Sequence, residues 1–173
     1  MPLNPLEFSA AMTRDYRNLA NLNEDNKPKS LGVPTNDTFP IAFANNYDDY
    51  AKKGVVLGAT NVGGDKSILV DAMINSRNLL ELSVKLSEYW STVAIVQGPP
   101  GYGGTPVSVV NDATAHVNSF RSALLASQTT SVSLPFYFQM INNIQTMAIN
   151  KINWTVTENF GSSGNRTFIS KII

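Results

Sequence analysis

Residues 80–86 read LELSVKL, and the interpretation of this stretch decides the fold class of the chain. Its apolar and polar residues alternate strictly, which is the period-two pattern of a half-buried strand. Leu79, Leu82 and Leu86 also fit one face of a helix. The strand is favoured because residues 90–97 continue with aromatic and β-branched side chains, which suit a pleated sheet. We therefore expect a strand here and a mainly β fold.

Other short strands are predicted on both sides of this stretch. They cover residues 39–43, 55–59, 107–110 and 132–139, followed by a C-terminal hairpin up to Ile173. A change in alternation near Asn150 and Lys151 predicts a β-bulge, and the glycines of residues 161–165 predict the hairpin turn. Seven to nine short strands between turn-rich loops favour a single jelly-roll-like β-barrel or sandwich.

Two helices are expected beside the strands. In the first, Asn4 is the cap, Pro5 opens the first turn, and Glu7, three residues on, should reach back to the cap. An apolar stripe then runs through Phe8, Met12, Tyr16 and Leu19. Residues 21–38 carry no such pattern and contain two prolines and a glycine, which is typical of an extended arm. We therefore divide the chain into an N-terminal helix and arm, residues 1–38, and a β-barrel domain, residues 39–173.

The second helix is predicted from the spacing of Ala113, Val117, Phe120 and Leu124, with Asn111 or Asp112 as its cap. Phe120 and Leu124 should pack this helix against the sheet. In the last hairpin, Ile152, Trp154 and Val156 should share one buried face.

The composition indicates a neutral, hydrogen-bonding surface. Charged residues are 15% of the chain, against roughly 25% in ordinary soluble domains. Asn, Ser, Thr and Gln together supply 52 of the 173 residues. Because 13 basic residues balance 13 acidic ones without a strongly basic window, we expect no direct nucleic-acid binding. The chain has no cysteine and no apolar run long enough to span a bilayer.

A phosphate-binding loop is the first motif to weigh. Gly58 and Gly63 have the spacing of a P-loop, but Gly64 and Asp65 separate them from Lys66. The inserted acid would face the phosphates, so we interpret the segment as a glycine-rich turn and expect no nucleotide binding.

Catalytic and metal motifs are equally incomplete. His116 is the only histidine in the sequence, and it lies four residues after Asp112, as in a helix-surface ion pair. Asp48 and Asp49 would point to opposite faces of a strand, so we place them in a solvated loop. A calcium-loop spacing begins at Asn21 but lacks the glycine and glutamate that such a loop needs. We assign no catalytic, cofactor-binding or metal-binding residue and expect a non-enzymatic protein.

In length and composition the chain resembles the smaller major capsid protein of tailless, membrane-containing icosahedral bacteriophages, a family of single β-barrel shell proteins. The resemblance covers the full length and rests on the strand run from Phe39 to Gln139, the hairpin from Met147 to Ile173, and the absence of cysteine. It implies an upright jelly roll in a virion capsid, made in the host cytoplasm. It also implies dimers or higher capsomers, a second, larger capsid protein as partner, and an internal viral membrane nearby.

Self-assembly is therefore the expected function, through the N-terminal residues 1–38 or the final residues 166–173. Candidate interface residues lie on the first helix and in the loop before residue 106: Leu6, Phe8, Met12, Pro99, Pro100 and Tyr102. Two alternatives remain. A phage tail or decoration protein would have the same composition, and a carbohydrate-binding module would display Tyr102, Trp90 or Trp154.

Overall fold

The computed structural model describes residues 3–19, 39–56, 59–95, 105–127, 146 and 148–172. Within them lie the α-helices α1 (Pro5–Leu19), α2 (Phe39–Lys52), α3 (Lys66–Asn75), α4 (Leu79–Thr92) and α5 (Val117–Ser127), and the short 3-10 helices η1 (Ala113–His116) and η2 (Gly161–Ser163). One antiparallel sheet holds β1 (Val55–Val56), β2 (Ala59–Gly63) and β3 (Ala94–Ile95), and a second holds β4 (Thr105–Asn111), β5 (Trp154–Asn159) and β6 (Asn165–Ser170).

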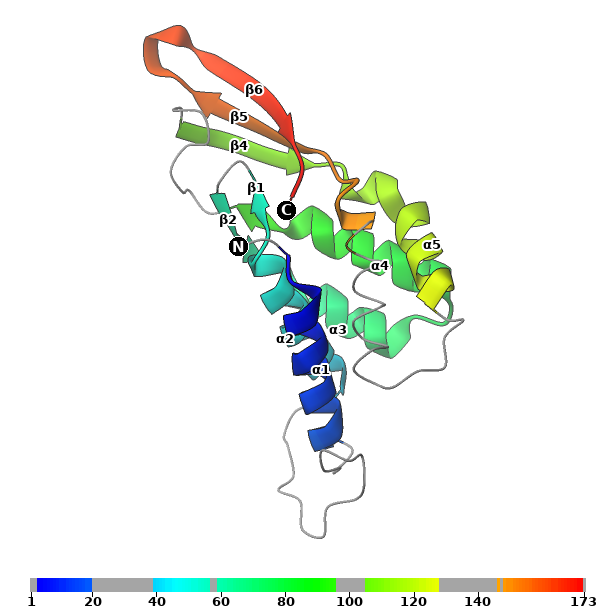
Figure 1. Ribbon diagram of the computed structural model, residues 1–173. Helices are drawn as coiled ribbons and strands as arrows, with labels where there is room; N and C mark the ends of the chain where they lie inside the picture. Colours follow the sequence, from blue (N-terminus) through cyan, green and yellow to red (C-terminus); the bar gives the residue numbers. More distant parts are fainter. Residues whose placement is uncertain are drawn as a thin grey trace.

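This architecture contradicts the mainly β, jelly-roll-like barrel expected from the sequence. In the described part of the chain, most residues in regular structure are helical, and the two sheets have only three strands each. Figure 1 shows the helices gathered into one body, with the sheet of β4, β5 and β6 at one end and its hairpin tip pointing away from the helices. The predictions failed at residues 39–43 and 80–86, which are both helical.

The start of α4 shows why residues 80–86 form a helix. Asn78 Oδ1 accepts a hydrogen bond from Glu81 N at 2.9 Å, and Glu81 Oε2 accepts one from Arg77 N at 2.8 Å. The first bond satisfies a backbone donor that a helix start leaves open, and the second ties the residue before the cap to the first turn. An Asn followed three residues later by Glu is a helix-start signal in the sequence, and here it prevails over the alternation.

Burial along α4 follows the helical period. Leu86, Tyr89 and Trp90 are buried, whereas Leu80 is 46% exposed. A strand would have placed Leu80 and Leu86 on the same face.

Helix α2 replaces the predicted first strand. Pro40 occupies its first turn, where a backbone N–H has no partner within the helix, so the proline costs nothing. Phe43, Tyr47 and Tyr50 continue at helical spacing, and the two tyrosines are buried. The alternation over residues 39–43 was too short to reveal this period.

The core of the body is an aromatic cluster between α1, α2 and α4. Ring centroids lie 6.0 Å apart for Phe8 and Tyr47, 5.5 Å for Tyr47 and Tyr89, and 5.8 Å for Tyr89 and Trp90, all near perpendicular. Edge-to-face pairs of this kind add about 0.5–1.5 kcal/mol each beyond area burial. Trp90 Nε1 donates to Tyr47 Oη at 3.0 Å, and burial raises the pKa of Tyr47 above its ordinary range.

The N-terminal helix is confirmed with its cap. Asn4 Oδ1 accepts hydrogen bonds from Leu6 N at 3.1 Å and Glu7 N at 3.4 Å. Phe8 and Met12 are buried in the same core as the aromatic residues of α2. Helix α1 therefore packs on α2, and the proposed domain boundary at residue 38 stays a prediction.

The predicted second helix is also confirmed, as η1 followed by α5. Asp112 occupies the N-cap position without a side-chain cap bond, and Asn111 Oδ1 accepts a hydrogen bond from Ala113 N at 3.0 Å, so both predicted residues lie at the helix start. Phe120 and Leu124 are buried as expected. The helix that carries them, α5, packs mainly against α4, whereas the sequence predicted packing against the sheet.

The C-terminal hairpin forms as predicted, but the bulge before it does not. A helical turn ends near Asn150, where Lys151 N donates to Ala148 O at 3.1 Å, and this turn explains the change in alternation. The expected core residues are buried: Ile152, Trp154 and Val156. The predicted strand at 132–139 lies outside the described residues, as do the whole arm, residues 21–38, and the loop before residue 105.

Candidate assembly interface

The β5–β6 hairpin is fixed by its turn. Asn159 Oδ1 accepts a hydrogen bond from Gly161 N at 2.7 Å, and Phe160 N donates to Gly164 O at 2.9 Å. Gly161 and Gly164 have φ angles of 66° and 76°, a region that glycine enters without a steric penalty. From this turn the register runs along both strands without a shift.

The inner face of this sheet belongs to the core. Buried residues of β5 on this face are Trp154, Val156 and Glu158, which pair with Ser170, Phe168 and Arg166 of β6. The Arg166 guanidinium lies over the ring of Phe160, 5.2 Å from its centroid. The only cation of β6 is therefore held on the inner face, near the turn.

The opposite face of the sheet is open and neutral. Its register places Val110, Thr155 and Ile169 in one row across β4, β5 and β6, and Ser108, Thr157 and Thr167 in the next row. Val110 is 59% exposed and Ile169 is 72% exposed. Thr157 and Thr167 share a hydrogen bond of 3.1 Å. The described side chains of this face are apolar or hydroxyl and amide groups, so a partner could cover them without burying an ion.

The backbone of β6 faces outward at alternate residues. Hydrogen-bonded pairs alternate with non-bonded pairs along an antiparallel ladder. The bond from Phe160 N to Gly164 O marks a bonded pair in the register of the hairpin. By alternation, Asn165, Thr167 and Ile169 belong to non-bonded pairs and turn their N–H and C=O groups away from β5.

A second hydrogen bond gives the same alternation independently. Asp112 N donates to Asn153 O at 3.2 Å, in the register of the β4–β5 ladder. In this assignment the backbone N–H and C=O groups of Thr155 and Thr157 point toward β4, and those of Val156 point toward β6. The register of the hairpin gives the same directions.

The two edges of the sheet differ in protection. In β4, Pro106 has no N–H to donate, and the register shifts between Pro106 and Ser108. Prolines and irregularities of this kind discourage strand addition. Strand β6 contains neither a proline nor a register shift. Among the described residues it pairs only with β5.

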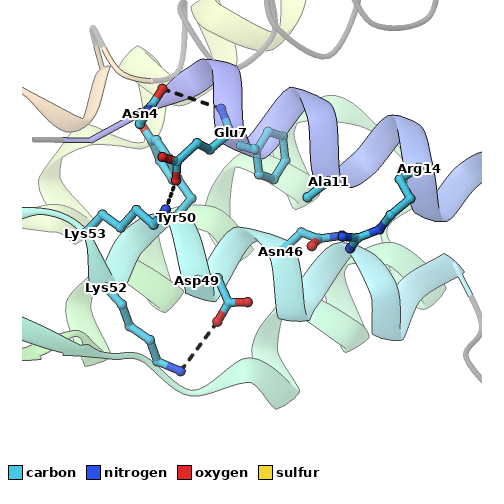
Figure 2. A pocket seen from close by; sticks show the side chains of 10 residues that line it. Asn4, Glu7, Ala11, Arg14, Asn46, Asp49, Tyr50, Lys52 and Lys53 are labelled. Carbon is cyan, nitrogen blue, oxygen red and sulfur yellow. Dashed lines mark hydrogen bonds and ion pairs between the residues drawn. The ribbon is translucent and has the colours of Figure 1, made fainter. Parts of the chain in front are cut away.

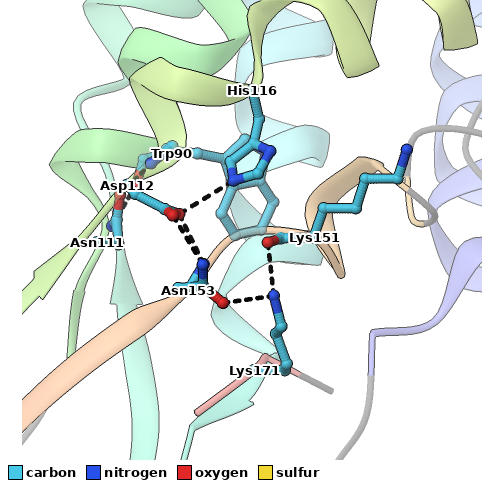
Figure 3. A network of polar contacts seen from close by, with 8 residues as sticks. Trp90, Asn111, Asp112, His116, Lys151, Asn153 and Lys171 are labelled. Carbon is cyan, nitrogen blue, oxygen red and sulfur yellow. Dashed lines mark hydrogen bonds and ion pairs between the residues drawn. The ribbon is translucent and has the colours of Figure 1, made fainter. Parts of the chain in front are cut away.

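A lysine at the end of β6 is held away from that edge. Lys171 Nζ donates to Lys151 O and to Asn153 Oδ1, both at 2.6 Å (Figure 3). Edge lysines often prevent strand addition by keeping a hydrated charge at the edge. Here the ammonium is bound to the base of the sheet.

The base of the sheet is anchored to the helices through Asp112. Its carboxylate accepts hydrogen bonds from Asn153 N at 2.7 Å and Asn153 Nδ2 at 2.8 Å, and His116 Nε2 lies 3.2 Å away (Figure 3). Burial raises the pKa of Asp112, but the bonds from Asn153 and the nearby His116 outweigh it, so the pKa lies below its ordinary value. Asn111 Nδ2 extends the network to Trp90 O at 3.0 Å.

This anchor predicts an acid-sensitive contribution to stability. Because the folded-state pKa of Asp112 is lower than its unfolded value of 3.8, its stabilisation is present above that pH and is lost as the pH falls through the folded value. Asp112→Asn should therefore lower the urea midpoint at neutral pH. The difference from the unmodified chain should shrink as the pH falls from neutral to below 3.8. An equal difference at both pH values would contradict the anchor.

Asp48 is not in a solvated loop, as the sequence suggested, but is buried in α2. Its Oδ1 accepts hydrogen bonds from Tyr89 Oη at 2.7 Å and Gly64 N at 2.9 Å, and its Oδ2 pairs with Lys52 Nζ at 2.8 Å. Burial is the main cause that raises the pKa of Tyr89 above its ordinary range, and the nearby Asp48 carboxylate raises it further. The group joins α2, α4 and the turn after β2.

Two glycines of the incomplete P-loop, Gly63 and Gly64, lie against the buried Asp48 carboxylate. Gly63 has φ 86°, and a Cβ there would lie 2.3 Å from Asp48 Oδ1. Asp65 caps α3 by accepting a hydrogen bond from Ser67 N at 2.9 Å. A carboxylate thus occupies the helix start that a phosphate would need, and the glycine-rich turn has a structural role.

A groove of about 420 Å³ lies between α1 and α2 (Figure 2). Its charged side chains are paired within the chain: Glu7 with Lys53, Asp49 with Lys52 at 3.8 Å, and Arg14 with Asp15 at 2.8 Å. Surface pairs of this kind contribute little to stability, and they leave the groove without a dominant charge.

The candidate interface residues are placed unequally. Phe8 and Met12 lie in the chain's own core. Leu6 is 61% exposed, so it is the one of the three candidates on α1 that a partner can reach. Pro99, Pro100 and Tyr102 lie outside the described residues. The sequence analysis did not single out Ile169 or Val110, although the alternation of the last strand was visible.

In the described ranges, no group of three or more metal-ligating side chains could hold a metal ion, and no helix there is long and apolar enough to cross a membrane. Comparison of the chain with known protein families, curated proteins and solved structures gave no match.

Proposed function

We propose that the chain is a structural protein that assembles with copies of itself, as a subunit of a virus particle. The observation that supports this proposal is the edge of β6, which pairs only with β5 among the described residues, together with the neutral sheet face beside it. A strand whose outward backbone groups are neither paired nor guarded by charge or proline is a template for another strand. In this protein the template projects from the helical body, where a partner can reach it (Figure 1).

The side chains of the open sheet face beside this edge are apolar or uncharged. Ile169 is 72% exposed and Val110 is 59% exposed, with Thr155 between them in the register. Burial of apolar area contributes about 25 cal/mol per Å². The threonines and asparagines beside them can exchange hydrogen bonds with a partner. A partner that covers this face as well as the edge would therefore remove apolar surface from water without trapping a charge.

The virion setting of this proposal comes from the sequence resemblance to a family of bacteriophage capsid proteins. The jelly roll implied by that resemblance is not the fold of this chain. Only the assembly role of that family therefore enters the proposal. A second capsid protein as partner and a nearby internal membrane belong to the same proposal. Electron microscopy of the assembled protein, free and in particles, tests this setting.

Sedimentation of the purified chain tests self-assembly itself. At tens of micromolar we expect at least a dimer, with a sedimentation coefficient that rises with concentration. Raising the salt concentration should have little effect, because the proposed contact contains no ion pair. A strictly monomeric chain under these conditions would contradict the proposal.

A carbohydrate-binding module is not favoured by the positions of the two tryptophans. Trp90 and Trp154 are fully buried, so neither can form an exposed stacking platform. A tail or decoration protein shares the assembly role and would be distinguished by rings or tubes in micrographs.

A further inference from the structure

We propose that two copies of the chain pair along β6, antiparallel and centred on Thr167, so that their two three-stranded sheets join across a two-fold axis. This inference rests on the proposed function and identifies the partner as a second copy. Three features of β6 carry it: the outward backbone groups, the position of the one charge, and the faces to which its side chains point.

The outward backbone groups match one another in this register. With Thr167 opposite Thr167 of the second copy, Asn165 lies opposite Ile169 of the second copy. These three residues are the ones that turn N–H and C=O toward the open edge, so each pair between them can exchange two hydrogen bonds. A centre at Phe168 would instead pair Asn165 with Lys171, which lies beyond β6 and is bound to the base of the sheet.

The charge pattern of β6 favours the antiparallel orientation. Arg166 is the only charged residue of the strand. Parallel pairing in register would place Arg166 beside its own copy, and like charges opposite each other are destabilising. Antiparallel pairing centred on Thr167 places Arg166 opposite Phe168, so the two cations stay apart.

The side-chain faces also match. A two-fold axis between antiparallel edge strands is perpendicular to the sheet, so the two open faces lie on the same side. The row of Val110, Thr155 and Ile169 then continues onto the sheet of the second copy. Each hairpin tip points toward the base of the other sheet.

The contrast between the two edges indicates a closed pair. Pro106 and the register shift in β4 discourage a third copy from adding at the far edge. Pairing through β6 alone uses the same surface on both copies and ends at two, whereas two open edges would propagate into a fibre.

Two substitutions on β6 and one matched control test this pairing in the full chain. Thr167→Pro removes an outward N–H, and the two-fold axis doubles the loss, while the bonds to β5 remain. Ile169→Lys places a hydrated charge at the edge. Each should raise the dimer dissociation constant about tenfold or more. Ile74→Lys on α3, where the isoleucine is 62% exposed, is the control and should leave it unchanged.

The outcomes separate this inference from the proposed function. If the unmodified chain is monomeric, both fail. If it is oligomeric and both β6 variants assemble as tightly as the control, β6 pairing is wrong and assembly uses another surface. Circular dichroism of each variant checks that the fold is retained.

A cross-linking experiment tests the register without weakening the contact. The chain has no cysteine, so Thr167→Cys introduces the only thiol. In the proposed register the two thiols face each other, at the Cα separation of about 5.5 Å that is usual for a bonded antiparallel pair and fits a disulfide. Mild oxidation should therefore give a covalent dimer for Thr167→Cys and not for Ile74→Cys. Absence of that dimer from an oligomeric Thr167→Cys sample would overturn the register.

Discussion

Replacing Trp90 with alanine is expected to lower the free energy of unfolding by about 3–5 kcal/mol. Trp90 is fully buried on α4 and packs edge-to-face against Tyr89 and Tyr47. Its loss leaves a cavity in the aromatic cluster and removes the hydrogen-bond partner of the buried Tyr47 hydroxyl. Chemical denaturation with matched m-values measures the change.

Leu80→Ala is the control for this prediction. Leu80 lies on the exposed side of the same helix, so its truncation should cost less than about 1 kcal/mol. Equal losses in the two variants would contradict the position of α4 in the core.

Gly63→Ala is expected to destabilise the protein by at least about 3 kcal/mol, through two independent effects. Its φ of 86° is unfavourable for alanine, and the new Cβ would lie 2.3 Å from Asp48 Oδ1. The buried carboxylate would have to move away from Tyr89 Oη and Gly64 N, its hydrogen-bond donors. Breaking a buried charged contact costs several kcal/mol because the charge is left without partners.

Gly161→Ala separates the two effects. Gly161 also has a positive φ, 66°, but a Cβ there would meet nothing within 4 Å. Its cost should therefore be limited to backbone strain, about 1 kcal/mol. Thermal unfolding midpoints of the two variants compare them directly. A Gly63→Ala midpoint no lower than that of Gly161→Ala would contradict the close packing around Asp48.

Local signals predicted the elements whose ends they mark. The cap at Asn4 with Pro5 and Glu7 located α1, and the glycine-rich turn located the β5–β6 hairpin. In both places the hydrogen bonds that fix the structure join residues close in sequence. Such bonds can be recognised without knowledge of the rest of the fold.

The predictions at α2 and α4 are wrong because a short alternation overlaps a longer helical period in both segments. In α2 that period continues past residue 44, where Tyr47 and Tyr50 follow Phe43 at helical spacing. The helix-start pair Asn78 and Glu81 was equally visible. Short apolar segments fit both periods, so the signals at their ends have to decide.

The interface residues were harder to predict, because their exposure depends on contacts between distant segments. Phe8 and Met12 form an apolar stripe that could serve a partner or the chain itself. The packing of α1 on α2 resolves that choice in favour of the chain's own core. Conversely, Ile169 carries no local signal of its exposure, and only the register with β5 places it on the open face.

Amide hydrogen exchange in β6, followed as a function of protein concentration, tests the central claim most directly. The account predicts that the amides of Arg166 and Phe168, bonded within the hairpin, are protected at every concentration. Those of Thr167 and Ile169 should exchange fast in the dilute monomer and become protected as the dimer forms. Fast exchange at Thr167 and Ile169 in a sample that sedimentation shows to be dimeric would contradict assembly through the β6 edge.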